Sequence, residues 1–352
     1  MSEKGHQSLL FVGAYLSASK GTRAVAEDLA VRLRDRHWSV KITSTSRSRA
    51  GRLIDVFWTI WSSRSDYQIG CVDVFSGNAF WWAYGSAKLL RTLGKPIILT
   101  LHGGKLPIFA ARWPRHVRWL LSAADRVVTP SEYLRAHFFE IRDDIVLLRN
   151  AIDLSDYRFE HRVSAEPRLA WLRAFHSIYN PSLAVRAVAL LAKDYPRLML
   201  TMYGPDKHDG SLAEAEQLAR ELEIAERLVT PGSIPKSGVP QCLSRYDIFL
   251  NTTTAESFGV SVVEAAALGM CIVSTNVGEL PYIWTHDHDA LLVPPNDPHA
   301  MADAVRRILT EPGLAERLSR NARKTAEQFD WSFILQQWEA ILMSVIEKDS
   351  SG

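Results

Sequence analysis

The segment that decides the fold is Thr254-Ala255-Glu256-Ser257-Phe258-Gly259-Val260-Ser261-Val262-Val263-Glu264-Ala265-Ala266-Ala267-Leu268-Gly269-Met270. The apolar run 246–251 before it predicts a buried strand. The apolar and small residues 260–268 predict a packed helix that ends at Gly269. Glu256 then lies on a strand-to-helix loop, and Glu264 lies inside the helix.

The turn between these two glutamates is a candidate phosphate site. Free N–H groups in the first turn of a helix, aided by the helix dipole, bind anions. If residues 257–260 form that first turn, a carboxylate stands beside a phosphate cradle. This arrangement favours chemistry on a phosphorylated ligand.

Composition indicates an ordinary globular protein with room for two domains. The chain has 352 residues, of which 47% are hydrophobic and 23% charged. No apolar run approaches the roughly 18 residues that span a bilayer, and residues 1–8 lack the apolar stretch of a signal peptide. We therefore expect a cytoplasmic protein. The three cysteines, Cys71, Cys242 and Cys271, form no C-x-x-C pair, so we expect reduced thiols and no zinc site.

The two halves of the chain differ in charge. Residues 1–165 hold 24 Lys and Arg against 15 Asp and Glu, a net charge of +9, and the remaining residues hold 17 against 24, a net charge of −7. This difference either holds two domains face to face, or gives the first half an anionic partner or membrane surface, or is only solvated surface charge. Nucleic-acid binding is not expected, because no recognition motif accompanies the positive charge.

Strand and helix patterns alternate through the first half, which predicts a parallel sheet covered on both faces. Ligands of such sheets bind beyond the carboxyl ends of the strands. His102 directly follows the predicted strand 96–101 and so lies on this rim. It is either a structural histidine or a functional one.

The loop 13–20 after the first strand lacks both the G-x-G-x-x-G and the P-loop spacing. Lys20 and Gly21 either present charge and N–H groups to a phosphate, or only form the turn before a helix. A basic and aromatic helix is predicted from Pro114 to Ala124. It is either an interfacial patch near lipid headgroups or an ordinary surface helix. We expect most of Trp58, Trp61, Trp81 and Trp82 to be in the core.

A second alternation of strands and helices begins near Leu169. It includes a helix with Asp297 as N-cap and Pro298 at its first position. We expect a first domain over residues 1–160, a polar linker near 160–167, a second domain over 167–329, and a C-terminal helix over 330–348 that packs across both.

The residues quoted so far match a known family. The chain resembles the retaining, nucleotide-sugar-dependent glycosyltransferases of the GT-B fold in the class called family 4, over nearly its whole length. The strongest match is the pair of glutamates, which corresponds to the E-x7-E motif of that family. Further matches are 101–104 (LHGG), 128–134 (VTPSEYL), 148–153 (LRNAID), 275–281 (TNVGELP) and 292–298 (LVPPNDP).

The resemblance implies an α/β architecture of two Rossmann-like domains that face each other across a cleft. It also implies roles for the matching residues. Glu264 would bind the ribose hydroxyls, Glu256 would lie near the donor sugar, and His102 would face the donor sugar and the acceptor. The other implied donor-binding residues, which would hold the diphosphate, are Arg173, Ser257, Phe258, Gly259 and Val260.

One departure from the family pattern concerns a phosphate-binding lysine that usually follows the arginine. Residues 178–181 (Ile-Tyr-Asn-Pro) occupy its place. Lys20 or His176 would compensate, or the donor sits differently, or activity is low. Because the resemblance implies that protein donors replace a divalent metal, and we find no Asp-x-Asp that would bind one, we expect neither metal nor cofactor.

These observations predict a glycosyltransferase that moves a hexose-type sugar from a UDP- or GDP-sugar to a glycan or lipid-linked acceptor, with retention. It would act in the cytoplasm, with peripheral contact at the inner face of the membrane as a further possibility. Two alternatives stay open: a nucleotide-sugar epimerase of the same fold, and a catalytically silent binding protein. The missing lysine favours the silent protein.

Overall fold

The computed structural model describes residues 7–13, 25–43 and 49–350. Its chain divides into two compact units. The first comprises Met1–Ala151 and Ser332–Gly352, and the second is the continuous stretch Ile152–Trp331. Each unit holds one six-stranded sheet.

The sheet of the first unit is parallel, with the strand order β2-β1-β3-β4-β5-β6. Val74 pairs with Leu101, so β3 and β4 end together at one edge. The chain segments that follow these strands therefore meet at that edge, as predicted for a doubly wound sheet. The strands are β1 (Ser8–Val12), β2 (Ser39–Ile42), β3 (Ile69–Val74), β4 (Ile97–Leu101), β5 (Arg126–Thr129) and β6 (Val146–Leu147).

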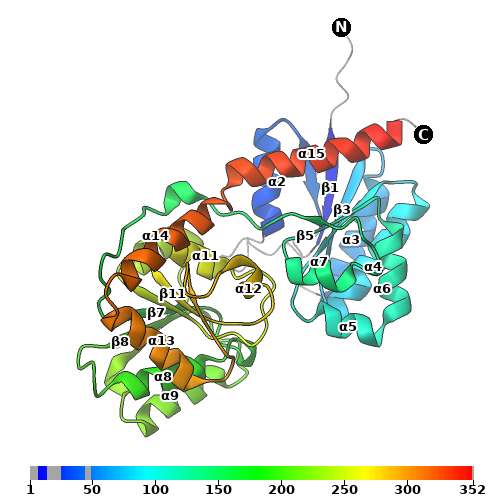
Figure 1. Ribbon diagram of the computed structural model, residues 1–352. Coiled ribbons are helices and arrows are strands. Elements are labelled where there is room, and N and C mark those ends of the chain that lie inside the picture. Colours follow the sequence, from blue (N-terminus) through cyan, green and yellow to red (C-terminus); the bar gives the residue numbers. More distant parts are fainter. Residues whose placement is uncertain (1–6, 14–24, 44–48, 351–352) are drawn as a thin grey trace. The chain divides into compact units, whose positions relative to one another are not determined.

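Helices cover this sheet, and Figure 1 shows α3, α4 and α6 side by side. The C-terminal helix α15 belongs to the first unit from Ser332 onward, and its packing across both domains stays a prediction. It is tied there by an ion pair of 3.8 Å between Arg36 and Glu339. The helices are α2 (Val25–Asp35), α3 (Arg49–Ser62), α4 (Asn78–Thr92), α5 (Leu106–Arg112), α6 (Pro114–Ala123), α7 (Glu132–Phe138) and α15 (Trp331–Ser350).

The expectation that the tryptophans of the first half are mostly core is wrong. Trp58 is 61% exposed, Trp61 47% and Trp81 36%. Helix α3 is apolar on more than one face, so while Val56 and Ile60 pack inward, Ile54, Trp58 and Trp61 are left exposed. Apolar character alone could not show which face would meet the sheet.

The predicted helix from Pro114 is α6, which has one buried and one exposed face. Val117, Leu120 and Leu121 are buried, whereas Arg115 and Arg118 are exposed. Contact of this helix with a membrane stays a prediction. Within the described part of the chain, no helix has the length and apolarity needed to cross a lipid bilayer. Cys71, Cys242 and Cys271 are free thiols, as predicted.

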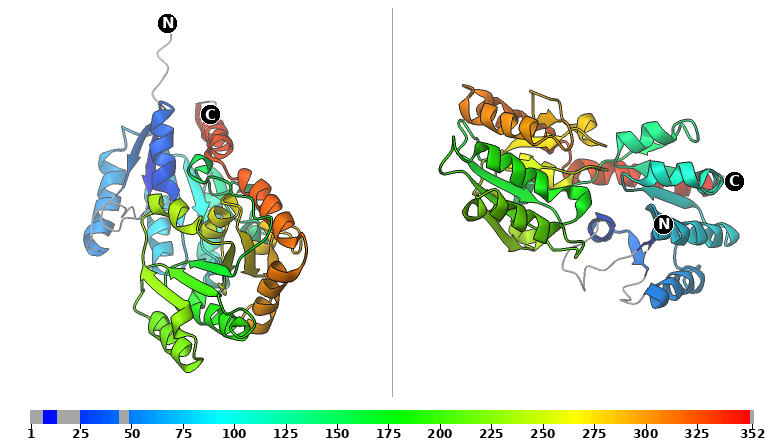
Figure 2. Two further views of the ribbon diagram at one scale, coloured as in Figure 1. Left: turned by 90° about the vertical axis from the view of Figure 1, so that its left-hand side faces the viewer. Right: turned by 90° about the horizontal axis from the view of Figure 1, so that it is seen from below.

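The second unit repeats the same plan, with the parallel strand order β12-β11-β10-β7-β8-β9. The right-hand view of Figure 2, seen from below, shows the helices of this unit around its sheet. Helices α8, α9 and α13 pack on one another, and α11 packs on α14. The strands are β7 (Arg168–Leu172), β8 (Met199–Tyr203), β9 (Leu228–Gly232), β10 (Ile248–Asn251), β11 (Cys271–Thr275) and β12 (Leu291–Val293).

Helix α13 of this unit begins as the sequence predicts. Asp297 caps α13 by accepting a hydrogen bond from the N–H of Ala300 at 2.9 Å, and Pro298 is its first residue. The helices are α8 (Pro181–Leu191), α9 (Ser211–Glu221), α10 (Val239–Leu243), α11 (Val260–Ala267), α12 (Leu280–Ile283), α13 (Pro298–Thr310) and α14 (Leu314–Glu327). Short 3-10 turns are η1 (Leu154–Asp156), η2 (Ser177–Tyr179), η3 (Ala225–Arg227) and η4 (Lys236–Gly238).

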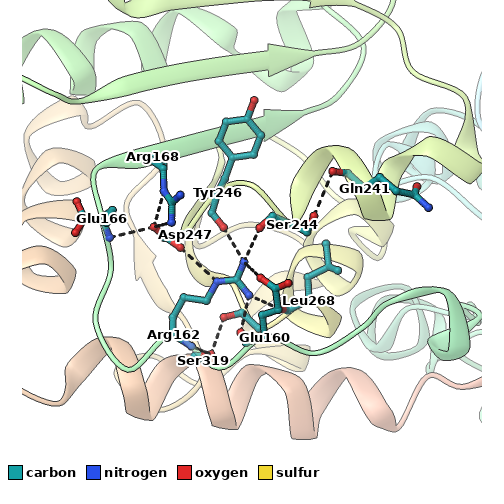
Figure 3. Close-up of polar contacts among 11 residues, drawn as sticks. Glu160, Arg162, Glu166, Arg168, Gln241, Ser244, Tyr246, Asp247, Leu268 and Ser319 are labelled. Atoms are coloured by element: carbon teal, nitrogen blue, oxygen red, sulfur yellow. Dashed lines mark hydrogen bonds and ion pairs between the residues drawn. The ribbon is translucent and has the colours of Figure 1, made fainter.

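The polar stretch expected as a linker, 160–167, is anchored inside the second unit. Arg162 is only 5% exposed, and its guanidinium lies at the centre of the contacts in Figure 3. It donates to the carbonyl oxygens of Ser244 and Tyr246, both at 3.0 Å, and of Leu268 at 2.6 Å. These carbonyls come at or just after the ends of α10 and α11, where helical partners are missing.

Asp247 provides the opposite charge in this cluster. Its Oδ1 accepts from Arg162 at 3.4 Å, and its Oδ2 accepts from Arg168 at 2.8 Å and from the N–H of Glu166 at 3.0 Å (Figure 3). Polar composition predicted a linker. Instead, the charged side chains pair with each other, and Arg162 donates hydrogen bonds to carbonyl oxygens at the ends of α10 and α11. The segment is therefore part of the folded unit.

Candidate functional site

The candidate donor site of the second unit is built at the carboxyl ends of its strands. Arg173 directly follows β7, and Glu256 lies on the loop between β10 and α11. Gly204 allows the chain after β8 to approach Arg173 closely. It has a φ of +152°, and a Cβ there would come within 1.6 Å of the Arg173 carbonyl oxygen. Only glycine fits this contact.

Arg173 and Glu256 form an ion pair through Nη2 and Oε2. Both side chains are largely buried, which strengthens the attraction relative to a surface pair. The guanidinium also lies over the ring of Tyr179, 5.1 Å from its centroid. Its Nε is buried without a hydrogen-bond partner among the described residues, so one N–H donor is unused.

The second carboxylate oxygen of Glu256 binds the loop that follows it. Oε1 accepts from the N–H groups of Ser257 at 3.0 Å and Phe258 at 3.3 Å. These N–H groups thus bind the carboxylate of the neighbouring side chain, and phosphate binding by this loop stays a prediction. Gly278 makes room for this turn, because its φ is +56° and a Cβ there would lie 2.0 Å from the Glu256 carbonyl oxygen.

Residues 257–260 do not form the first turn of the helix, whereas the predicted helix 260–268 is present. Helix α11 begins at Val260, and Gly259 precedes it in a left-handed conformation with φ +88°. This glycine interrupts the helical geometry, so Ser257 and Phe258 lie on the loop rather than in the helix. Their N–H groups point to the Glu256 carboxylate instead of the helix axis.

Glu264 is buried inside α11, with 3% of its surface exposed. Its Oε1 accepts a hydrogen bond of 2.7 Å from the hydroxyl of Tyr157 and also pairs with the ammonium of Lys236. Its Oε2 has no hydrogen-bond partner within the described ranges. One oxygen is therefore fixed by the protein, while the other is open to a ligand with hydroxyl donors.

Tyr157 and Lys236 are residues that sequence reasoning missed. Burial, and then the neighbouring Glu264, raise the pKa of the Tyr157 hydroxyl well above its ordinary value, so it keeps its proton and donates. No spacing pattern could have found these two, because each is distant from Glu264 in the chain. A lysine beside a Pro and a Gly, in Pro235-Lys236-Ser237-Gly238, is an ordinary surface-turn pattern.

The segment that replaces the expected phosphate-binding lysine is a rigid turn. Its carbonyl oxygens are held by threonines of the β10–α11 loop: Thr254 N–H donates to Ile178 at 2.8 Å, and Thr252 donates to Tyr179 at 2.6 Å. His176, a candidate substitute cation, uses Nδ1 to accept from the N–H of Ile178 at 3.1 Å. The other candidate, Lys20, lies outside the described residues together with Gly21.

The first unit places His102 directly after β4, at the predicted rim. Its Nε2 lies 3.1 Å from Oδ1 of Asp73, and both side chains are mostly buried. Its ring stacks on Phe75 at a centroid distance of 4.8 Å and an interplanar angle of 16°. The carboxylate and the aromatic ring fix the orientation of the imidazole. Its catalytic role stays a prediction.

Among the described residues, no group of three or more His, Cys, Asp and Glu is placed to hold a metal ion. The expectation of metal independence itself stays a prediction. The site instead offers cationic and N–H donors, which suit an anionic ligand.

The chain is similar to known proteins over most of its length. The model of the family "Glycosyl transferases group 1" matches residues 156–325, and that of "Glycosyltransferase Family 4" matches residues 1–156. D-inositol 3-phosphate glycosyltransferase from Streptomyces avermitilis is 25% identical in an alignment 281 residues long, and the match covers 73% of this chain and 60% of that protein. N-acetyl-alpha-D-glucosaminyl L-malate synthase from Bacillus anthracis is 25% identical, and the match covers 73% of this chain and 70% of that protein.

Solved structures share the fold over nearly the whole chain. Anabaena HepE, solved in complex with UDP and glucose, has a TM-score of 0.80 at 18% identity and covers 96% of this chain and 100% of its own. Sucrose-phosphate synthase from Thermosynechococcus elongatus has a TM-score of 0.83 at 18% identity, covering 97% and 100%. With the two family models matching residues 1–325 between them, this chain belongs to the group 1 glycosyltransferases of the GT-B fold.

Proposed function

We propose that the chain transfers a hexose-type sugar from a UDP- or GDP-sugar to a glycan or lipid-linked acceptor, with retention at the anomeric carbon. Membership of the group 1 family supports sugar transfer. A nucleotide-sugar donor is supported by Anabaena HepE, which was solved with UDP and glucose. The observation that carries the proposal most directly is the anion site around Arg173.

This anion site suits a diphosphate. Arg173 and the N–H groups of Ser257 and Phe258 all converge on one carboxylate, that of Glu256. A diphosphate carries more negative charge than a carboxylate and has more acceptor oxygens, so it competes well for the same donors. On donor binding, Glu256 then gives up Arg173 and turns toward the sugar.

The nucleotide end of the donor would meet Glu264. The open Oε2 accepts from a ribose hydroxyl, while Tyr157 and Lys236 hold Oε1 in place. A ribose diol offers two neighbouring O–H donors, which a carboxylate binds well. The site therefore holds the donor at both its ribose and its diphosphate.

The chemical step exchanges one bond for another at the anomeric carbon. The bond from this carbon to the diphosphate oxygen breaks, and a bond to the acceptor oxygen forms on the same face. The proton of the acceptor hydroxyl passes to the departing phosphate oxygen. Arg173 and the loop N–H groups stabilise the negative charge that builds on the leaving group, and Glu256 stabilises positive charge on the sugar.

The test compares variants in a transfer assay read by mass spectrometry with UDP- and GDP-sugars and an acceptor panel. We expect Arg173→Ala to reduce transfer by a factor of at least about 100, since one preorganised donor typically contributes 10²–10³. Glu256→Gln should also reduce it strongly. Arg320→Ala, an exposed arginine on α14, is the matched control and should behave as the parent protein. Unchanged transfer in both site variants would show that the site is wrongly assigned.

The same samples separate the two other candidate activities. An epimerase converts a UDP-sugar to its isomer with no acceptor present. A silent binding protein raises its melting temperature with UDP or GDP but gives no product with any acceptor. The absence of a lysine from 178–181 is the feature that favours the silent protein.

A further inference from the structure

The first unit contains an apolar cavity of about 120 Å³ beside the carboxyl ends of β1 and β3. A dry apolar cavity of about 150 Å³ is known to take up benzene, so this one has the size for a small apolar group. Its lining is almost wholly apolar, with Asp73 and Ser86 as the polar members. The lining residues are Val12, Gly13, Val56, Val72, Asp73, Phe75, Ala79, Trp82, Ala83 and Ser86.

The cavity adjoins His102 through two shared side chains. Phe75 lines the cavity and stacks on the imidazole, and Asp73 lines the cavity and lies 3.1 Å from Nε2 of His102. A molecule in the cavity would therefore touch the residues that orient this histidine. The cavity is an extension of the His102 site rather than a separate void.

One polar group in the lining is unused. Ser86 is 1% exposed, and its Oγ has no hydrogen-bond partner in the part of the chain that the structure describes. A buried hydroxyl without a partner carries a free-energy cost, which a ligand oxygen would remove. The lining thus fits a ligand whose apolar group is attached to an oxygen atom, with that oxygen hydrogen-bonded to Ser86.

Helices α3 and α4, which both contribute residues to the cavity lining, also form an open apolar groove. Ile54, Phe57, Trp58 and Trp61 of α3 line it together with Leu89 of α4. On α4, Trp82 and Ser86 of the cavity and Leu89 of the groove follow the helical spacing of 0, 4 and 7, so one stripe of that helix serves both. Ile54 is 70% exposed and Trp58 61%, a large apolar surface for a helix in water.

We propose that the acceptor is an amphiphile, and that its apolar group binds along the α3–α4 pair, beginning in the cavity beside His102. The proposal rests on the proposed sugar transfer, because it assigns the occupant as the acceptor. The polar head would lie at His102, and the apolar part would be covered by side chains that otherwise face water.

The probe is a series of alkyl β-D-glucopyranosides, from methyl to octyl, each below the concentration at which it forms micelles. Calorimetric titration should show affinity rising about fourfold per added methylene until the cavity is filled, as expected for burial of about 0.8 kcal/mol per methylene. Equal binding of the methyl and octyl compounds would overturn the proposal.

A pair of variants tests the location. Ala79 is exposed and lines the cavity, so Ala79→Trp fills its mouth without disturbing the core. Thr92→Trp places the same side chain at an exposed position at the other end of α4. The chain-length dependence should disappear in Ala79→Trp and persist in Thr92→Trp. Persistence in both variants would overturn the assigned site.

A last arm separates this inference from the proposed function. UDP-sugars and GDP-sugars are supplied with the octyl and methyl glucosides, and products are identified by mass. Glycosylation of octyl glucoside in preference to methyl glucoside supports both proposals. Chain-length-dependent binding with no product from either glucoside, while UDP or GDP still raises the melting temperature, overturns the acceptor assignment. Transfer to polar acceptors with no dependence on chain length leaves the proposed function standing and overturns the inference alone.

Discussion

The Tyr157 hydroxyl donates a hydrogen bond of 2.7 Å to Glu264, although 107 positions separate the two residues in the chain. The bond is buried and fixes Oε1 of the carboxylate, so Oε2 keeps one orientation. The carboxylate is therefore preorganised for a ligand instead of being free to rotate. Preorganisation of this kind favours binding because less side-chain freedom is lost.

We expect Tyr157→Phe to weaken UDP or GDP binding. It removes one hydrogen bond to a charged acceptor, worth about 1.5–3 kcal/mol, so the dissociation constant should rise roughly 10- to 100-fold. Calorimetric titration measures this change. Tyr282→Phe is the control, since Tyr282 is 50% exposed. A dissociation constant equal to that of the parent protein would contradict the ribose role of Glu264.

Glu256→Gln should affect binding and transfer in opposite directions. The Glu256 carboxylate occupies the donors that a diphosphate needs, so loss of its charge leaves Arg173 more available. UDP affinity should rise by up to about tenfold, which corresponds to 1.4 kcal/mol, while the rate of sugar transfer falls. Titration and single-turnover transfer measure the two effects. Weaker UDP binding together with slower transfer would contradict the prediction, because it would show that the substitution disrupts the site instead of freeing Arg173.

Arg162→Met should destabilise the second unit strongly. The substitution leaves Asp247 with the exposed Arg168 as its remaining charged partner in the cluster, and it removes the guanidinium donors from three carbonyl oxygens. Breaking a buried pair in this way costs about 3–5 kcal/mol. Arg168→Met is the matched control and should cost about 1 kcal/mol or less, because Arg168 is largely exposed. Chemical denaturation measures both, and equal losses would show that Arg162 does not organise the cluster.

Asp289 makes the stability of the second unit depend on pH. Burial raises the pKa of its carboxyl above the ordinary value, against the hydrogen bonds from Thr285 and Thr325. A raised pKa in the folded state means that the stabilising contribution is complete below the unfolded pKa and is lost as pH rises through the folded pKa. Asp289→Asn should therefore become more stable relative to the parent protein as pH rises from about 4 toward neutrality. Denaturation midpoints over this range provide the measurement, and a constant difference would contradict the prediction.

Local pattern was enough to predict much of the fold. Strands β7, β10 and β11 and the capped helix α13 follow from apolar runs and cap residues, because backbone periodicity and capping are encoded within a few positions. The proximity of Arg173 and Glu256 could also be predicted, because the resemblance assigned both residues to one donor site. Their direct ion pair was not predicted.

The rest depends on tertiary contacts that local pattern does not contain. Lys236 and Tyr157 meet Glu264 only because the chain folds back on itself. Arg162 looked like part of a solvated linker, but the ends of α10 and α11 bury it. The tryptophans of α3 were expected inside because apolar residues usually are, yet that helix has more apolar surface than its sheet can cover.

The ends of the second unit are bonded to each other. The N–H of Ile152 donates to the Phe329 carbonyl at 2.9 Å, and the N–H of Trp331 donates to the Ile152 carbonyl at 3.2 Å. Topologically, residues 152–331 are thus a closed insert between two parts of the first unit. Such an insert can be produced as one continuous piece of chain whose ends are already bonded to each other. The first unit, in contrast, is built from two separate pieces of chain. A stop codon just after position 331 should therefore leave nucleotide binding by the second unit intact. It should destabilise the first unit, which carries His102, because that unit loses residues 332–352.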